Sequence, residues 1–205
     1  LPENMHAQTG GTTKEGDHRL PLLRLEVPGE KHLEIRVLLE KPGESGGEIE
    51  KSLFRSGAPR EKNGPRAAGE LGLFHTRFFN ANGLDINGEI AGAHGSARDV
   101  AVLFEYILKK YPEIIDGTRK EKISVTSLSN ITHEGVNTNT KIADIPGILG
   151  SKTGFTDLSG GNLVVAYNPS LNRPIIISVL GSTYDGRFED VLALIAAVNE
   201  YFATE

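Results

Sequence analysis

The sequence predicts a mixed α/β domain of the α+β type, in which an antiparallel sheet is flanked by helices. Three observations favour this class. Three short strand-like segments joined by brief connections occupy residues 150–180, and apolar stripes with helical spacing occupy residues 96–111 and 187–202. Strands with short connections pair as antiparallel neighbours, so both amphipathic helices are expected to pack on that sheet.

The first helix is predicted from its start signal and its stripe. Ser96 is a suitable N-cap, with Asp99 three residues later as a short version of the capping box. Pro112 is expected to end the helix. Arg98 and Asp99 are interpreted as cap and surface charges rather than as catalysts. The stripe consists of Val100, Leu103, Phe104, Ile107, Leu108 and Tyr111.

The strands follow later in the chain. Residues 122–127 alternate like a half-buried strand. Further strands are expected from about Gly150, over 162–167 and over 174–180, with residues 168–173 as a hairpin connection between the last two. The final helix is expected over about 187–202, and its apolar stripe consists of Phe188, Val191, Leu192, Ile195, Val198 and Phe202.

Residues 1–68 are poorly patterned, whereas residues 69–205 carry the regular elements, so we expect a division near residue 68. Leu33–Leu39 fits either a strand or half a helix. Gly43–Gly47 matches the Gly-x-Ser-x-Gly elbow of hydrolases, with Ser45 at its centre, but the flanking Pro-Gly-Glu favours a loop.

The composition excludes several classes of function. The chain has 205 residues, a net charge of −5 and no basic tract, so nucleic acid is not an expected partner. It has no cysteine, which excludes thiol catalysis and thiolate metal sites. The six histidines form no His-x-His or His-x-x-x-His pair, so neither a metal nor a cofactor is expected. The apolar runs are too short for a transmembrane segment.

The stretch Gly150–Asp157 is the most informative for chemistry. Its sequence, Gly-Ser-Lys-Thr-Gly-Phe-Thr-Asp, brings an ammonium group, hydroxyls and glycines together beside an expected strand. Lysine offers three donors on a point charge, and glycine lets a backbone approach a ligand closely. These groups together suit the binding of a carboxylate and of an extended peptide backbone.

Five blocks of the sequence match one known family: Leu71–Leu73 with Thr76, Phe78, Asn80 and Gly83–Leu84; Ser96–Asp99; Asn137–Asn139; Gly150–Thr156; and Gly181–Thr183 with Gly186–Phe188. Through these blocks, the segment from about Gly69 to Phe202 resembles the C-terminal part of the serine D-alanyl-D-alanine carboxypeptidases, the low-molecular-mass penicillin-binding proteins. Lys-Thr-Gly is one signature of penicillin-binding proteins. The resemblance implies an antiparallel sheet covered by helices on both sides, with the active site between the sheet edge and a helical subdomain.

The resemblance also implies residue roles. Lys152 and Thr153 would hold the terminal carboxylate of a peptidoglycan stem peptide ending in D-Ala-D-Ala, or that of a β-lactam inhibitor. Gly154 would let the substrate backbone lie along the strand, and the backbone N–H of Phe155 would be an oxyanion donor. The implied location is the cell envelope, outside the cytoplasm. The expected substrate-binding set is Ser151, Lys152, Thr153, Gly154, Phe155 and Thr156.

Two further motifs of that family are absent from the sequence. None of the twelve serines is followed by lysine three residues later, so the Ser-x-x-Lys nucleophile motif is missing, and we expect the chain to begin after it. Ser170-Leu171-Asn172 has Ser-x-Asn spacing but is interpreted as a hairpin turn. Thr138–Lys141 mimics a hydroxyl-x-x-Lys motif and is interpreted as structural.

Patterning and likeness to the family both increase suddenly near Gly69, which suggests that residues 26–67 are a frame-shifted or corrupted translation of the segment that should carry Ser-x-Asn. The DNA read in its other two frames tests this hypothesis, which fails if neither frame encodes Ser-x-Asn. Two alternative functions stay open at this point. One is a non-catalytic remnant that binds peptidoglycan or β-lactams, and the other is an unrelated serine hydrolase that uses Ser45.

Overall fold

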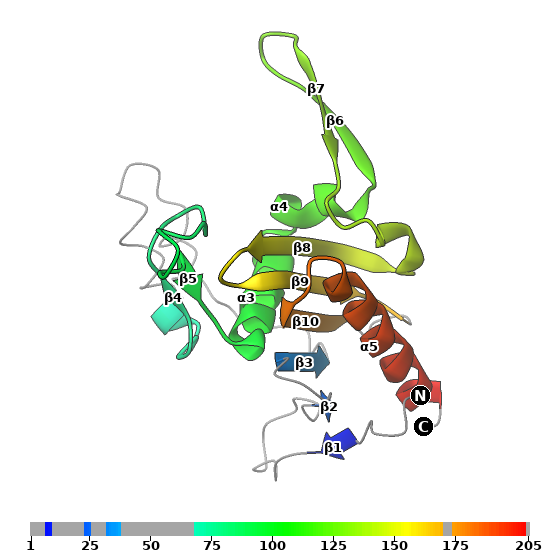
Figure 1. Cartoon of the computed structure of the whole chain (residues 1–205). Helices are drawn as coiled ribbons and strands as arrows, with labels where there is room; N and C mark the ends of the chain where they lie inside the picture. The colour runs from blue at the N-terminus through cyan, green and yellow to red at the C-terminus, as the bar shows by residue number, and fades with distance from the viewer. Residues whose placement is uncertain (1–6, 10–22, 26–31, 38–67, 170–173, 204–205) are drawn as a thin grey trace.

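A six-stranded sheet with helices on both faces forms the body of the protein (Figure 1). The computed structural model describes residues 7–9, 23–25, 32–37, 68–169 and 174–203. The strand order is β1-β2-β3-β10-β9-β8, and every neighbouring pair is antiparallel. The predicted fold class is therefore confirmed.

The three C-terminal strands are those expected from the sequence. They are β8 (Ile148–Thr156), β9 (Gly160–Tyr167) and β10 (Ile175–Ser182). β9 lies between the other two strands. Its Leu163 lies opposite Thr153 of β8, and its Val165 lies opposite Ile177 of β10. The predicted hairpin between β9 and β10 includes residues 170–173, which lie outside the described residues.

Two long helices, α3 (Ala97–Lys110) and α5 (Gly186–Ala203), cover opposite faces of this sheet (Figure 1). Successive side chains of a strand point to opposite faces, and β9 divides its apolar residues accordingly. Leu163, Val165 and Tyr167 belong to the core under α5, whereas Val164 and Ala166 belong to the core under α3. Each fully buried aliphatic side chain contributes about 1.5–3 kcal/mol relative to an exposed one.

The ends of α3 follow from local sequence. Ser96 Oγ accepts a hydrogen bond from Asp99 N at 3.1 Å, as the N-cap prediction requires. The helix ends at Lys110, and Pro112 then begins a second helix, α4 (Pro112–Asp116). Proline suits this first position because it has no N–H to leave unpaired. The 3₁₀ turn η1 (Gly117–Arg119) follows directly.

The sheet is extended by strands from the poorly patterned region. They are β1 (Ala7–Thr9), β2 (Leu23–Leu25) and β3 (His32–Val37). β3 pairs with β10 over six residues, from His32 opposite Leu180 to Val37 opposite Ile175. The ambiguous segment at residues 33–39 is thus a strand over the part that is described. Ser45 and the remainder of residues 38–67 lie outside the described residues, so the elbow and the frame-shift hypotheses stay predictions.

A hairpin of β6 (Lys122–Thr126) and β7 (Thr132–Val136) projects away from the sheet (Figure 1). Every residue of β6 is exposed, so the prediction of a strand there is confirmed and that of half-burial is wrong. Both faces of the hairpin meet solvent, because all residues of β6 and all residues of β7 except Gly135 are exposed.

Two small elements complete the architecture. β4 (Arg77–Phe78) pairs with β5 (Ala93–His94) beside the start of α3, and the 3₁₀ turn η2 (Ile142–Asp144) precedes β8. Across the described ranges, no helix combines the length and the apolar character needed to cross a lipid bilayer.

Candidate active site

The strand β8 forms one edge of the sheet, and this position makes its backbone available to a ligand. Ser151 N donates to Thr118 Oγ1 at 3.0 Å, so the Ser151 amide points away from β9. Amide directions alternate along an antiparallel strand. The amides of Thr153 and Phe155 therefore point to the same outer edge as that of Ser151.

The polar loop before η2 supports β8 from the α5 side. Thr138 Oγ1 and Thr153 Oγ1 lie 2.6 Å apart, and Asn139 Nδ2 donates to Ser151 Oγ at 3.3 Å. Asn139 is 1% exposed, and Asn137 Nδ2 donates to the carbonyl oxygens at positions 118 and 120. These contacts agree with a structural role for the loop that contains Thr138–Lys141. They were not predicted from the sequence individually, because each partner lies 12 to 19 residues away.

Lys152 and Gly154 lie on the opposite face of β8 from Ser151 and Thr153. Ser151 and Thr153 are 2% and 9% exposed, whereas Lys152 is exposed and Gly154 is half-buried. The Lys152 ammonium donates to the carbonyl oxygen of Thr153. Within the described residues, no carboxylate forms an ion pair with Lys152. Its charge is therefore available to an anion that approaches along the open edge.

The fold itself does not require a glycine at position 154. Its φ is not in the left-handed region, and an added Cβ would meet only Asn162 Cβ, at an ordinary 3.6 Å. Gly150, on the same face of the same strand, differs because an added Cβ there would lie 3.0 Å from Ile115 Cδ1. Packing thus explains a small residue at position 150 but leaves the one at position 154 unexplained.

The C-terminal end of β8 is held by the first turn of α5. Arg187 Nη1 donates to the carbonyl oxygen of Gly154 at 2.7 Å, and Arg187 is 3% exposed. Its guanidinium carbon lies 4.4 Å from the Tyr184 ring centroid, and the Tyr184 ring meets Phe155 edge-on at 5.1 Å. Sequence reasoning did not assign a function to Arg187. The available signal was an arginine directly before the apolar stripe of a helix, in a block that matches the resembled family.

The turn that follows β8 is closed by side-chain contacts. Thr156 Oγ1 donates to Ser159 Oγ at 2.9 Å, and Asn162 Nδ2 donates to the same oxygen at 3.0 Å. Asn162 Oδ1 accepts from Gly181 N at 3.1 Å, so this amide also joins β9 to β10. The hydroxyl of Thr156, one of the predicted binding residues, is thus engaged in the turn.

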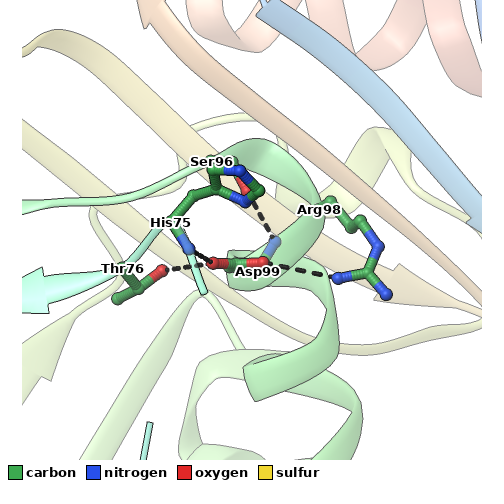
Figure 2. A network of polar contacts seen from close by, with 5 residues as sticks. All are labelled: His75, Thr76, Ser96, Arg98 and Asp99. Carbon is green, nitrogen blue, oxygen red and sulfur yellow. Dashed lines mark hydrogen bonds and ion pairs between the residues drawn. The ribbon is translucent and has the colours of Figure 1, made fainter. Parts of the chain in front are cut away.

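A buried carboxylate lies away from β8, at the start of α3 (Figure 2). Asp99 is 0% exposed and accepts from His75 N at 2.8 Å and from Thr76 Oγ1 at 3.0 Å. The Arg98 guanidinium lies 3.5 Å from its second oxygen. The interpretation of Asp99 as a surface charge is therefore wrong, because partners 23 and 24 residues earlier fold over it. This network fixes the segment before α3 to the helix.

The remaining sequence predictions fall at other places. Ser170-Leu171-Asn172 lies outside the described residues. No group of three or more His, Cys, Asp or Glu side chains with the arrangement of a metal site occurs among the described residues. The six predicted binding residues are consecutive on β8, but their side chains divide between its two faces.

Comparison with known proteins gives a family match. The sequence model described as D-alanyl-D-alanine carboxypeptidase matches residues 65–183, which is more than half of the chain. The chain is 27% identical over 134 residues to the D-alanyl-D-alanine carboxypeptidase DacA of Escherichia coli K12. That alignment covers 65% of this chain but only 31% of the E. coli protein. The chain therefore spans about a third of this curated relative.

Solved structures agree with this match. An ampicillin-bound penicillin-binding protein of Listeria monocytogenes aligns with a TM-score of 0.59 and 28% identity, covering 71% of this chain and 57% of that one. A DD-transpeptidase of Streptomyces aligns with a TM-score of 0.57 and 20% identity, over 71% of this chain and 58% of that one. At 20% identity the second likeness is one of fold alone.

Proposed function

The chain belongs to the D-alanyl-D-alanine carboxypeptidase family, and we propose that its strand β8 is the substrate-binding strand of a site for peptides ending in D-Ala-D-Ala. The single observation that carries this proposal is the outer edge of β8 at Thr153 and Phe155, which pairs with no other described strand and lies beside an exposed ammonium group. The reaction class is serine-type peptide hydrolysis on peptidoglycan stem peptides, outside the cytoplasm.

Lys152 and Thr153 are proposed to bind the C-terminal carboxylate of the peptide. The exposed Lys152 ammonium has three donors, of which one contacts the Thr153 carbonyl oxygen. A hydroxyl donates one hydrogen bond and accepts two, so Thr153 can donate to a carboxylate while accepting from Thr138. Charge-assisted hydrogen bonds of this kind are about twice as strong as neutral ones.

The backbone of β8 is proposed to bind the peptide as an added strand. The Phe155 amide lies on the outer edge, where it can donate to the carbonyl oxygen of the scissile bond. Such a donor gains strength as that oxygen becomes an oxyanion in the transition state. Gly154 would leave room for the peptide on the face that it shares with Lys152, which explains a glycine that the fold does not need.

The covalent step needs a nucleophile that these residues do not supply in the family's usual form. No serine of the 205 residues precedes a lysine at the Ser-x-x-Lys spacing. This observation favours, as a second candidate, a protein that binds the peptide or a β-lactam without cleaving it. A fluorescent penicillin separates the two, because covalent labelling of the chain indicates catalysis and reversible binding indicates the non-catalytic candidate.

The proposal is tested by measuring the affinity for a fluorescent peptide ending in D-Ala-D-Ala. We expect saturable binding that is lost when the carboxylate is amidated or when the two residues are L-alanine. Lys152→Gln should weaken binding at least tenfold, because it removes the charge but keeps a donor. Lys120→Gln, at an exposed position, is the matched control and should bind like the wild type. Equal affinity for the acid and the amide would contradict the proposal.

A further inference from the structure

We propose that Arg187 is a positioning residue that strengthens the Phe155 amide as a hydrogen-bond donor. This inference rests on the proposed function of β8. Arg187 does not reach the outer edge of the strand itself, because its guanidinium binds the opposite end of one peptide group. That group joins Gly154 to Phe155, so its carbonyl oxygen receives the guanidinium and its N–H faces the ligand.

The geometry of the peptide group supports this assignment. The C=O and N–H of a trans peptide point in opposite directions. Because the Phe155 N–H points away from β9, the Gly154 C=O points toward the side from which Arg187 Nη1 donates at 2.7 Å. The guanidinium, the peptide group and a carbonyl oxygen of a ligand would therefore form one chain of hydrogen bonds.

The charge state of Arg187 points in the same direction. Arginine keeps its positive charge at any physiological pH, and buried charges are normally paired with an opposite charge. Arg187 is 3% exposed, yet in the described part of the chain it forms no ion pair with a carboxylate, and its Nε has no hydrogen-bond partner. A developing oxyanion at the edge of β8 would supply the missing negative charge.

Aromatic rings hold the guanidinium in this position. Its central carbon lies 4.4 Å from the Tyr184 ring centroid and 4.7 Å from that of Phe188, within the range of cation–π attraction. The Tyr184 ring in turn contacts the Phe155 ring. The arginine is therefore fixed relative to the same residue whose amide it polarises.

The expected size of the effect follows from general magnitudes. Hydrogen-bond chains strengthen each bond by roughly 10–30%. One oxyanion donor changes a rate by about 100- to 1,000-fold. If Arg187 changes the free energy contributed by the Phe155 amide by roughly 10–30%, the corresponding factor in oxyanion binding changes about two- to eightfold. The effect on the binding of a neutral carbonyl group should be small.

The experiment compares two ligands on the full chain. One is a peptide ending in D-Ala-D-Ala, and the other is its phosphonate analogue, in which a tetrahedral anionic phosphorus replaces the carbonyl carbon of the scissile bond. We expect Arg187→Met to reduce the preference for the phosphonate two- to eightfold, whereas Arg187→Lys keeps part of that preference. Arg119→Met removes an equal charge from an exposed position and should keep the full preference.

A double-mutant cycle tests whether Arg187 acts through the amide. Phe155→Pro removes the N–H, and Phe155→Ala removes only the ring. Proline is tolerated on an edge strand where its missing N–H faces outward. We expect Arg187→Met to lower the phosphonate preference in the Phe155→Ala background but not in the Phe155→Pro background. An equal loss in both backgrounds would overturn the inference.

The outcomes separate this inference from the proposed function. If the wild-type chain binds neither ligand, the proposed function fails. If the wild type prefers the phosphonate and the Met and Lys variants of Arg187 keep that preference in full, the positioning role is wrong and the proposed function stands. Thermal unfolding of each variant identifies a misfolded protein. If Arg187→Met does not fold, Arg187→Lys decides, and full preference in that variant overturns the inference.

Discussion

Replacing Gly154 with alanine separates ligand binding from folding. The added Cβ would meet only Asn162 Cβ at 3.6 Å, and the backbone φ is not in the left-handed region. Glycine-to-alanine changes at such compatible positions stabilise a protein by about 0.4–1 kcal/mol, since alanine reduces the entropy of the unfolded chain. We therefore expect Gly154→Ala to unfold at the wild-type urea midpoint or above it.

The same methyl group should impair binding. It would project on the face of β8 that carries Lys152, into the space assigned to the peptide. We expect the affinity for a peptide ending in D-Ala-D-Ala to fall at least tenfold, which corresponds to about 1.4 kcal/mol. Gly150→Ala is the matched control on the same face. Its Cβ would lie 3.0 Å from Ile115 Cδ1, so overpacking should reduce stability by about 1–3 kcal/mol.

Urea denaturation and fluorescence anisotropy of a labelled peptide measure the two effects on each variant. Unchanged peptide affinity in a folded Gly154→Ala protein would refute the assignment of this face to the ligand. A large loss of stability in Gly154→Ala would show instead that the glycine serves the fold.

Three further predictions concern stability. Asp99→Ala should lower the unfolding free energy by about 3 kcal/mol, because it leaves His75 N and Thr76 Oγ1 without their acceptor. Asp99→Asn should lower it less. Equal stability of Asp99→Ala and the wild type in urea would contradict this prediction. Gly161→Ala should disrupt the native fold, and with it the cooperative unfolding transition, because the added Cβ would collide with the Thr183 carbonyl oxygen. A sharp thermal transition of this variant at the wild-type temperature would contradict the prediction. Burial raises the pKa of Tyr167, so above about pH 10 the folded state keeps the phenol proton that the unfolded state loses. The free energy of unfolding should therefore fall by about 1.4 kcal/mol per pH unit in that range, and Tyr167→Phe should remove this part of the pH dependence. The same slope of stability against pH in Tyr167→Phe and the wild type would disprove the prediction.

Local patterns predicted the elements that pack on the sheet. The Ser96 N-cap, the stripes of both helices and the three strands after residue 147 were recovered within a few residues. Alternation over residues 122–127 also predicted a strand, but it carried no information on what the strand would contact. The hairpin projects from the sheet, so a pattern typical of half-burial belongs to an exposed element.

The site was only partly predictable because its support is long-range. The Lys-Thr-Gly stretch located β8, yet its position at the sheet edge depends on its pairing, which among the described strands is with β9 only. The bond from Arg187 to the Gly154 carbonyl spans 33 residues, and the bond from Ser151 N to Thr118 spans another 33. Such contacts follow from topology, which no short window of sequence contains.

The most direct test of the central claim is to follow the backbone amide resonances during titration with a peptide ending in D-Ala-D-Ala. We expect the largest saturable shifts at the outward-facing amides of Thr153 and Phe155, and small shifts on the projecting β6–β7 hairpin. The peptide ending in L-Ala-L-Ala should leave these amides unchanged. Shifts centred elsewhere, or the same shifts with the L-peptide, would contradict the assignment of β8 as the substrate-binding strand.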